Sequence, residues 1–404
     1  MSKPTHTPFA DIPNWGAACI WLNQQKKYKS IDFFCGAGGL SIGFERAGFE
    51  TVFASDWDSA AIETFNFNRP GERIVGHQAD IKSLFLEKEE RSIFADVVTG
   101  GPPCQSFSTA NRQRIIDDPR NNLYKEFVRC CNAIKPKAIV MENVLGIRKA
   151  SEQILEDFRG IGYLGEMFTF SAADFGVPQN RRRVIFILYR TNSRKTASVK
   201  IAAFKDSMEK ARSTAKSSTL ADAIAGLRAL TPKKVKNRTD IEDDMSGYTV
   251  DKPFAGGNKT YLNAINGPHQ MARSLIFNHK ARYNNPRDIK IFGLLPQGGN
   301  SLHPSIADIM PYKSRNGIFK DKFFKLVSTE ACKTVCAHMK FDCNMYIHPT
   351  QPRGLTPRES ARVQSFPDNY VFKGTLGQWY QQIGNAVPPL LAFHIAEALK
   401  KMLK

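Results

Sequence analysis

The 404-residue sequence lacks the long apolar runs that build membrane-spanning helices. No stretch of eighteen or more apolar residues occurs, and the opening MSKPTHTPFADIPNWG lacks the charged-then-apolar order of a signal peptide. The eight cysteines follow no regular framework, which predicts reduced thiols in a cytosol and not disulfides. We therefore expect a cytoplasmic protein with no membrane partner.

Acidic residues are also scarce, with 38 Asp and Glu against 57 Lys and Arg, for a net charge of +19. Such a balance indicates a polyanionic partner, with nucleic acid favoured over an acidic membrane surface. Residues 191–352 alone hold 26 basic and 13 acidic residues, or +13 of that total. The chain is long enough for two lobes, and this loop-rich segment is expected to form a second, smaller lobe that contacts nucleic acid.

The cysteines of this basic segment do not form a strong metal motif. Cys332, Cys336 and Cys343, together with His338 and His348, could suggest zinc, but they do not make two tight cysteine pairs. We expect no metal.

A glycine-rich turn lies near the start of the chain, in IDFFCGAGGLSIGFERAG from Ile31 to Gly48. The pattern predicts a strand, a turn and then a helix, whose N-terminus favours a negatively charged group. Ser41 stands where the dinucleotide pattern G-x-G-x-x-G has its third glycine, so a nucleotide-like ligand is expected but NAD is not favoured.

Two aspartates follow the next predicted strands. Asp56 comes twenty residues after Gly36, where a carboxylate can accept from both hydroxyls of a ribose, and Asp80 could accept from an adenine amino group. Each alone could be a turn or helix-cap residue. Their order behind the glycine turn favours an adenosine site.

Three further sites carry candidate catalytic groups. Cys104 follows a short apolar strand and the stiff turn GGPP, which makes it a candidate nucleophile, although an ordinary loop cysteine is the alternative. Glu142 ends another apolar strand and is a candidate proton donor, or else a solvated loop glutamate. In QNRRRV, strand alternation sends Arg181 and Arg183 to one side and Arg182 to the other.

The last segment contains two predicted helices. Thr356 and Pro357 form a helix-start signal, and residues 390–403 are predicted to form an amphipathic closing helix. Asn385, in the turn before that helix, could reach the ligand if the helix returns to the first lobe.

Six blocks in this order resemble the bacterial DNA (cytosine-5)-methyltransferase family, from restriction-modification systems or as orphan enzymes: DFFCGAGG, GGPPCQSFS, MENV, QNRRRV, RESARVQSFPD and QIGNAVPP. The resemblance implies an α/β fold, with a Rossmann-like, S-adenosylmethionine-dependent methyltransferase domain and a smaller irregular target-recognition domain. The implied division is an N-terminal extension over 1–30, a catalytic domain over 31–190 and 370–404, and a target-recognition domain over 191–369. The helix through Glu359 would brace the small lobe.

The resemblance also implies residue roles. Cys104 would be the nucleophile, Glu142 the acid at ring nitrogen 3, and Arg183 the donor to the cytosine carbonyl, with Arg181 supporting it. Ala386 departs from the family, whose members often have a serine there. The residues that would line the S-adenosylmethionine site are Asp32, Phe34, Gly36, Ala37, Gly38, Gly39, Leu40, Asp56, Trp57, Asp80, Ile81, Gly101, Pro103, Leu123, Asn385, Ala386 and Val387.

The implied activity is methylation of carbon 5 of a specific cytosine in double-stranded DNA, with base flipping and a covalent Cys104 adduct at carbon 6. We expect a monomer, with a possible cognate restriction endonuclease as partner. Two alternatives stay open. One is a tRNA cytosine-5 methyltransferase, against which the basic segment argues, and the other is a catalytically silent DNA-binding relative, which would be expected to have lost Cys104, Glu142 or Arg183.

Overall fold

The computed structural model describes residues 28–71, 75–85, 93–103, 122–233, 259–267, 276–311 and 322–404. The predicted nucleophile Cys104 lies outside these residues, as does most of the N-terminal extension. Within the described ranges, no helix combines the length and the apolar character needed to cross a membrane.

The first lobe is built on a seven-stranded sheet in the order β3-β2-β1-β4-β5-β8-β6. Strands β1 to β5 pair in parallel, whereas β8 runs antiparallel to both of its neighbours, β5 and β6. The carboxyl ends of the other strands therefore meet at the edge where β8 begins. The strands are β1 (Tyr28–Phe33), β2 (Phe49–Asp56), β3 (Gly76–Gln78), β4 (Val97–Gly100), β5 (Ala138–Asn143), β6 (Tyr163–Ser171) and β8 (Arg182–Arg190).

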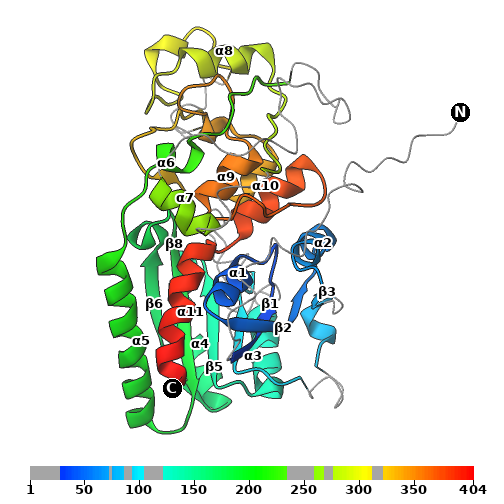
Figure 1. Ribbon diagram of the computed structural model, residues 1–404, viewed down its shortest axis with the longest axis vertical. Coiled ribbons are helices and arrows are strands. Elements are labelled where there is room, and N and C mark those ends of the chain that lie inside the picture. Colours follow the sequence, from blue (N-terminus) through cyan, green and yellow to red (C-terminus); the bar gives the residue numbers. More distant parts are fainter. Residues whose placement is uncertain are drawn as a thin grey trace, which may run out of the picture.

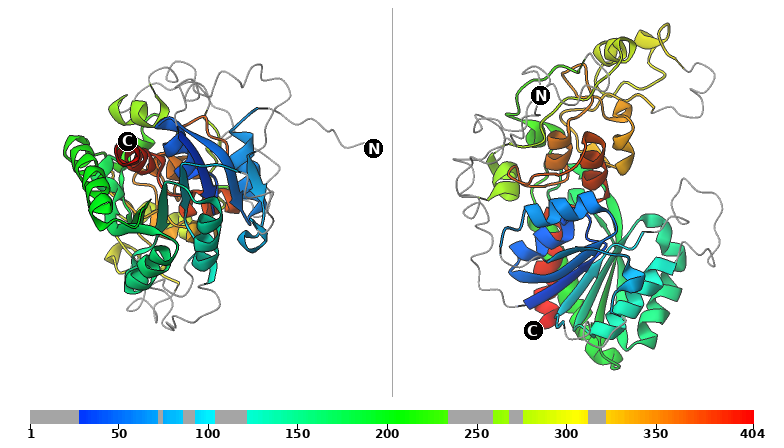
Figure 2. Two further views of the ribbon diagram at one scale, coloured as in Figure 1. Left: turned by 90° about the horizontal axis from the view of Figure 1, so that it is seen from below. Right: turned by 90° about the vertical axis from the view of Figure 1, so that its right-hand side faces the viewer.

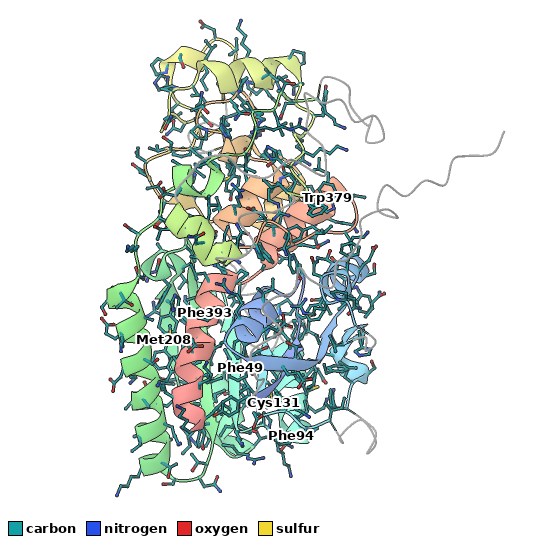
Figure 3. The ribbon with its side chains drawn as sticks, viewed as in Figure 1. Phe49, Phe94, Cys131, Met208, Trp379 and Phe393 are labelled. Carbon is teal, nitrogen blue, oxygen red and sulfur yellow. The ribbon has the colours of Figure 1, made fainter. Side chains whose placement is uncertain are left out.

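Helices cover both faces of this sheet (Figures 1 and 2). One face packs against α1 (Gly39–Arg46), α5 (Arg194–Thr214) and α11 (Pro389–Leu403). The other packs against α3 (Asn122–Ile134) and α4 (Ser151–Gly160). Because side chains alternate along a strand, β5 contributes Ala138 and Val140 to the first core and Ile139 and Met141 to the second. In Figure 3, Met208 and Phe393 mark the first layer and Cys131 the second. The remaining helix, α2 (Ser59–Phe67), packs against β2 and β3.

The second lobe, drawn above the sheet in Figure 1, consists of short helices and long irregular connections. Its own sheet has two strands, β7 paired with β9, and α6, α7, α9 and α10 all contribute to its main apolar core. Helix α8 lies at the end of the lobe that is remote from the sheet (Figure 1). The elements are β7 (Gln179–Asn180), α6 (Leu220–Ile224), α7 (Lys259–Asn266), α8 (Pro286–Leu294), β9 (Cys332–Lys333), the 3-10 helix η10 (Ala337–Lys340), α9 (Pro357–Val363) and α10 (Leu376–Asn385).

Packing departs from the expected division of the chain at two helices. The expectation assigned α5 to the second lobe, but its Ile201, Phe204 and Met208 are buried against the sheet. It also assigned α10 to the first lobe, but Tyr380 and Ile383 belong to the core of the second. A count of charges assigned α5 to the wrong lobe because its basic residues cover its outer face. Its apolar stripe decides where the helix packs.

Helix α9 is fully buried and organises the second lobe, as the resemblance implies. Thr356 caps it and Pro357 occupies its first turn, which confirms the predicted helix start. Glu359 completes the capping box and accepts two hydrogen bonds of 2.7 Å from Arg353. Arg362 is paired with Asp368 in the same way, so buried charges are compensated within the lobe.

Candidate active site

A cavity of about 670 Å³ opens at the edge of the sheet where the parallel strands end, below the second lobe. Its wall combines segments that are far apart in the sequence: the glycine turn after β1, the ends of β2 and β5, the loop after β4, the start of β8 and the end of α10. This is the edge at which open α/β sheets place their ligands. Apart from Cys104, all of the predicted catalytic residues line it, as do most of the predicted cofactor residues.

The glycine turn and Asp56 are joined in the wall of the cavity. Gly36 has a left-handed backbone with φ of 52°, and its N–H donates to Asp56 Oδ2 at 2.8 Å. The Asp58 N–H donates to Asp56 Oδ1 at 2.9 Å, and burial raises the pKa of Asp56. A Cβ on Gly36 would meet nothing within 4 Å, so this side of the turn is open. The carboxylate is thus held in place, and its oxygens retain lone pairs for a ligand.

The C-terminal segment returns to this turn and completes the wall. A Cβ on Gly39 would lie 2.3 Å from the carbonyl oxygen of Val387 and 3.1 Å from Ala386 Cβ, so only glycine permits this approach. Asn385, Ala386 and Val387 line the cavity, and α11 then packs on α1. The closing helix α11 thus returns to the first lobe, which is the condition under which Asn385 was expected to reach a ligand.

Three predicted cofactor residues lie behind the wall and do not line the cavity. The carboxylate of Asp32 is 1% exposed and accepts from Ser41 Oγ at 2.6 Å and Thr99 Oγ1 at 2.7 Å. Burial raises the pKa of Asp32 to about 6. The carbonyl of Ala37 accepts from the Tyr370 hydroxyl, and a Cβ on Gly38 would collide with Phe65 and Arg69. These residues support the turn from its far side.

The other predicted cofactor residues line the wall of the cavity. Asp80 accepts from the Lys82 N–H at 3.0 Å as it caps a short 3-10 helix, and the side chain of Trp57 is 74% exposed at the cavity. Phe34 has an unusual φ of 55°, which marks strain at the end of β1. The remaining lining residues of the prediction are Leu40, Ile81, Gly101, Pro103 and Leu123.

The cavity also holds a carboxylate and a guanidinium at β5 and β8, which β4 separates from β1 and β2 in the strand order. Arg183 Nε donates to Glu142 Oε1 at 2.9 Å, and the two side chains are 14% and 12% exposed. The pair forms because β8 runs antiparallel to β5, which places the start of β8 beside the end of β5. Gly101 leaves room for it, since a Cβ there would lie 3.1 Å from Glu142 Oε2.

Arg181 faces the same side as Arg183, as the alternation predicted, but it makes different contacts. Its guanidinium is buried and donates to the carbonyl of Val335 at 2.8 Å and to that of Gly384 at 3.1 Å. Burial, with the charge of Arg183 as a second cause, lowers the pKa of Arg181 to about 9. Arg181 therefore joins the first lobe to the second. Arg182 points to solvent.

Asn143 is a site residue to which the sequence analysis gave no role. Its Nδ2 donates to the carbonyl of Pro102 at 2.9 Å, and its Oδ1 accepts from the Val144 N–H at 2.9 Å. It thereby ties the loop that leads to Cys104 to the end of β5. Its place directly after Glu142, in the block MENV, was the available signal.

The candidate zinc residues of the second lobe do not converge. Cys332 and Cys343 are buried free thiols, and Cys336 Sγ lies 3.2 Å from the Tyr346 hydroxyl. In the part of the chain that the structure covers, no group of three or more His, Cys, Asp or Glu side chains could hold a metal ion.

Comparison with known proteins gives consistent matches over nearly the whole chain. A family model described as C-5 cytosine-specific DNA methylase matches residues 28–401. The type II methyltransferase M.DdeI of Desulfomicrobium norvegicum is 34% identical over 392 residues, covering 91% of this chain and 88% of that protein. The type II methyltransferase M1.HphI of Haemophilus parahaemolyticus is 34% identical over 388 residues, covering 92% and 86%.

A solved structure extends the likeness to three dimensions. It is titled as a DNA modification methyltransferase encoded within a prophage of E. coli, and it aligns with a TM-score of 0.67 at 26% identity. The alignment covers 93% of this chain and 99% of that one.

Proposed function

Because the chain belongs to the C-5 cytosine-specific DNA methylase family, we propose that it methylates carbon 5 of a specific cytosine in double-stranded DNA, with S-adenosylmethionine as methyl donor. The observation that carries this proposal is the shared cavity, which holds the Glu142–Arg183 pair at β5 and β8 and the Gly36 turn with Asp56 at β1 and β2, on the other side of β4 in the strand order. Pro103, the residue before Cys104, is part of the same wall. A base site and a cofactor site would therefore adjoin, as direct methyl transfer requires.

The residues around the Gly36 turn fit an adenosyl group. Asp56 is fixed by two backbone N–H groups and would accept from the ribose hydroxyls, and Asp80 would accept from the adenine amino group. The open face of Gly36 allows the backbone to approach the ligand, and the exposed ring of Trp57 would cover it. When bound, S-adenosylmethionine supplies an electrophilic methyl group.

At β5 and β8, the chain's own groups would activate the cytosine. The Cys104 thiolate would form a bond to carbon 6 while Glu142 protonates ring nitrogen 3 and Arg183 donates to the ring carbonyl. Electron density would then be available at carbon 5 for the methyl group. After transfer, a base removes the carbon 5 proton, Cys104 leaves carbon 6 as a thiolate, and the proton on ring nitrogen 3 returns to Glu142; we expect water to be the base. The target base must leave the duplex for these contacts to form.

The second lobe carries part of the net charge of +13 in residues 191–352, and it is the proposed target-recognition lobe. On the packing described above, this lobe excludes α5 and includes α10. By likeness to the type II relatives, we expect a restriction endonuclease that acts on the same site. The monomeric state and the cytoplasmic location stay predictions.

The proposal is tested by incubating the purified chain and S-adenosylmethionine with duplex DNA and, separately, with tRNA. Bisulfite sequencing of DNA from cells that express the chain should show one methylated cytosine within one recognition sequence. Methylation of tRNA alone would establish the tRNA alternative, and methylation of neither would establish a silent relative.

The covalent step has its own test. A duplex with 5-fluorocytosine at the target should trap the wild type covalently, because fluorine at carbon 5 blocks the elimination that frees Cys104. Cys104→Ala should bind the duplex without trapping it or methylating it. Trapping by Cys104→Ala would remove this cysteine from the nucleophile role.

A further inference from the structure

The segment from β9 through η10 is fixed directly to the wall of the cavity. The Cys332 N–H donates to the carbonyl of Pro178 at 2.9 Å, and the Val335 N–H donates to Gln179 Oε1 at 2.8 Å. A Cβ on Gly384, a lining residue, would lie 2.2 Å from the backbone carbon of Cys336. Arg181 also donates to the carbonyl of Val335 in this segment and to that of Gly384 in α10. These contacts leave the segment little freedom to move relative to the cavity.

The end of η10 presents an aromatic ring to solvent. Met339 is fully buried, and Arg282 donates to the carbonyls of Met339 and Lys340 at 2.6 Å, so the backbone here is held from below. Phe341 follows and is 66% exposed. The ring of His338 lies 5.4 Å from the ring of Phe341, and His338 faces Asp342 at 4.0 Å.

Lys340 connects this ring to the cavity. Its Nζ lies 4.9 Å from the centre of the Phe341 ring and donates to Gln381 Oε1 at 3.1 Å. Gln381 lines the cavity. The centre of the Phe341 ring is therefore within about 8 Å of a group on the cavity wall. The ring therefore lies close to the cavity wall, on the α10 side of it.

The surroundings of Phe341 suit nucleic acid better than a protein. Phe341 is the one large apolar side chain that is exposed within residues 332–343, and the rings and cations recorded against it are those of His338 and Lys340. Its cationic neighbour Lys340 and the basic segment around it complement phosphates. An aromatic face next to a cation is the arrangement on which bases stack.

We propose that Phe341 stacks on a base of the bound DNA next to the target cytosine, while Lys340 contacts a phosphate beside it. This inference rests on the proposed function, because the base that enters the cavity is what places the duplex against η10. Phe341 would support its neighbouring base when the target leaves the stack. Unstacking a base pair is costly, so such a contact favours the flipped state.

The test compares Phe341→Ala, Phe341→Leu and Phe341→Trp with Phe94→Ala. Phe94 is 59% exposed, but it precedes β4 at the opposite edge of the sheet and lies at the far end of the first lobe (Figure 3). The probe is a duplex that carries the recognition sequence found by bisulfite sequencing. Fluorescence anisotropy gives its Kd at several salt concentrations, and single-turnover assays give the methylation rate.

We expect Phe341→Ala and Phe341→Leu to weaken duplex binding roughly ten-fold, since aromatic stacking is lost in both. The Kd of Phe341→Trp for the duplex should stay within a few-fold of the wild-type value, and the Kd of Phe94→Ala should equal the wild-type value. The slope of affinity against salt should be unchanged in Phe341→Ala but smaller by about one in Lys340→Gln. Retained melting temperature and S-adenosylmethionine affinity would show that Phe341→Ala is folded, and the Leu and Trp variants keep the test valid if it is not.

Two outcomes would overturn the inference. If the wild type methylates DNA while Phe341→Ala binds and methylates like Phe94→Ala, the stacking contact fails and the proposed function stands. If the wild type methylates no DNA, the proposed function fails and this inference fails with it.

Discussion

Arg183 Nε lies 2.9 Å from Glu142 Oε1, and the two residues come from adjacent antiparallel strands of the central sheet. Both side chains are largely buried, so the ion pair fixes the direction of the carboxyl group before any ligand is present. Gly101 and Asn143 complete the setting, one by leaving space and the other by holding the loop toward Cys104. Each of these relationships leads to a measurable consequence.

Replacing Glu142 with glutamine should separate base flipping from chemistry. The amide can still hydrogen-bond to ring nitrogen 3 but cannot transfer a proton, so single-turnover methylation should slow by roughly 10²–10⁴. With 2-aminopurine at the target position, the fluorescence rise on binding should resemble that of wild type. Glu166→Gln, which removes a surface ion pair with Lys205, is the matched control. Methylation within a few-fold of wild type would refute the acid role, and loss of flipping would assign Glu142 to base capture.

Asn143→Asp should slow methylation without loss of cofactor affinity. The substitution keeps the oxygen that accepts from Val144 but removes the donor to the carbonyl of Pro102. Losing a buried donor costs about 1–3 kcal/mol, so we expect roughly a ten-fold or greater fall in the single-turnover rate. Asn192→Asp, exposed in the loop after β8, makes the same chemical change away from the site. Equal rates for the two variants would mean that Asn143 does not position the Cys104 loop.

Asp80→Ala should weaken binding of S-adenosylmethionine by about 1–3 kcal/mol, because the adenine amino group would lose its acceptor. The change also removes the cap on the short helix at Ile81–Ser83, so the control must remove a comparable acceptor elsewhere. Asp157→Ala does so on α4, where Asp157 accepts from the Tyr124 hydroxyl. Calorimetry without DNA should distinguish them, and unchanged affinity in Asp80→Ala would count against the adenine assignment.

The second lobe should lose stability in mild acid through His348. Its Nδ1 accepts from the N–H groups of Thr350 and Gln351 at 3.1 Å, and burial lowers its pKa from 6.5 to about 4. Below pH 6.5 the unfolded chain therefore binds a proton that the folded chain does not. The free energy of unfolding should fall as pH drops from 6.5 toward 4, by roughly 2 kcal/mol at most between pH 7 and 5 from this residue.

Urea unfolding at pH 7 and pH 5 measures this effect. His348→Asn keeps an acceptor for the two N–H groups but does not titrate, so its loss between the two pH values should be smaller. Some loss remains, because burial also lowers the pKa of His279. Burial alone would raise the pKa of Glu359, but the Arg353 guanidinium holds it well below its usual range, so Glu359 contributes above pH 4.5 and stays constant in this window. An equal loss in wild type and variant would contradict the prediction.

The sequence by itself determined the local chemistry of the site. Strand ends, the glycine turn, the alternation of Arg181 and Arg183 and the capped start of α9 are all set by short-range pattern, and the structure has them where they were expected. The family followed from six blocks in order, and the family match over 28–401 confirms it. Short-range patterns suffice here because each depends on backbone geometry and burial within a few residues.

Only the tertiary structure decided how these pieces meet. That Val387 closes over Gly39, that Asp32 lies behind the cavity, and that Arg181 bonds to carbonyls of the second lobe all depend on contacts between segments distant in the chain. Tertiary contacts also decided to which lobe α5 and α10 each belong. An amphipathic stripe shows that a helix must bury one face, but it does not specify the surface against which that face packs. A residue's type limits what it can bind, whereas its neighbours in the fold determine what it does bind.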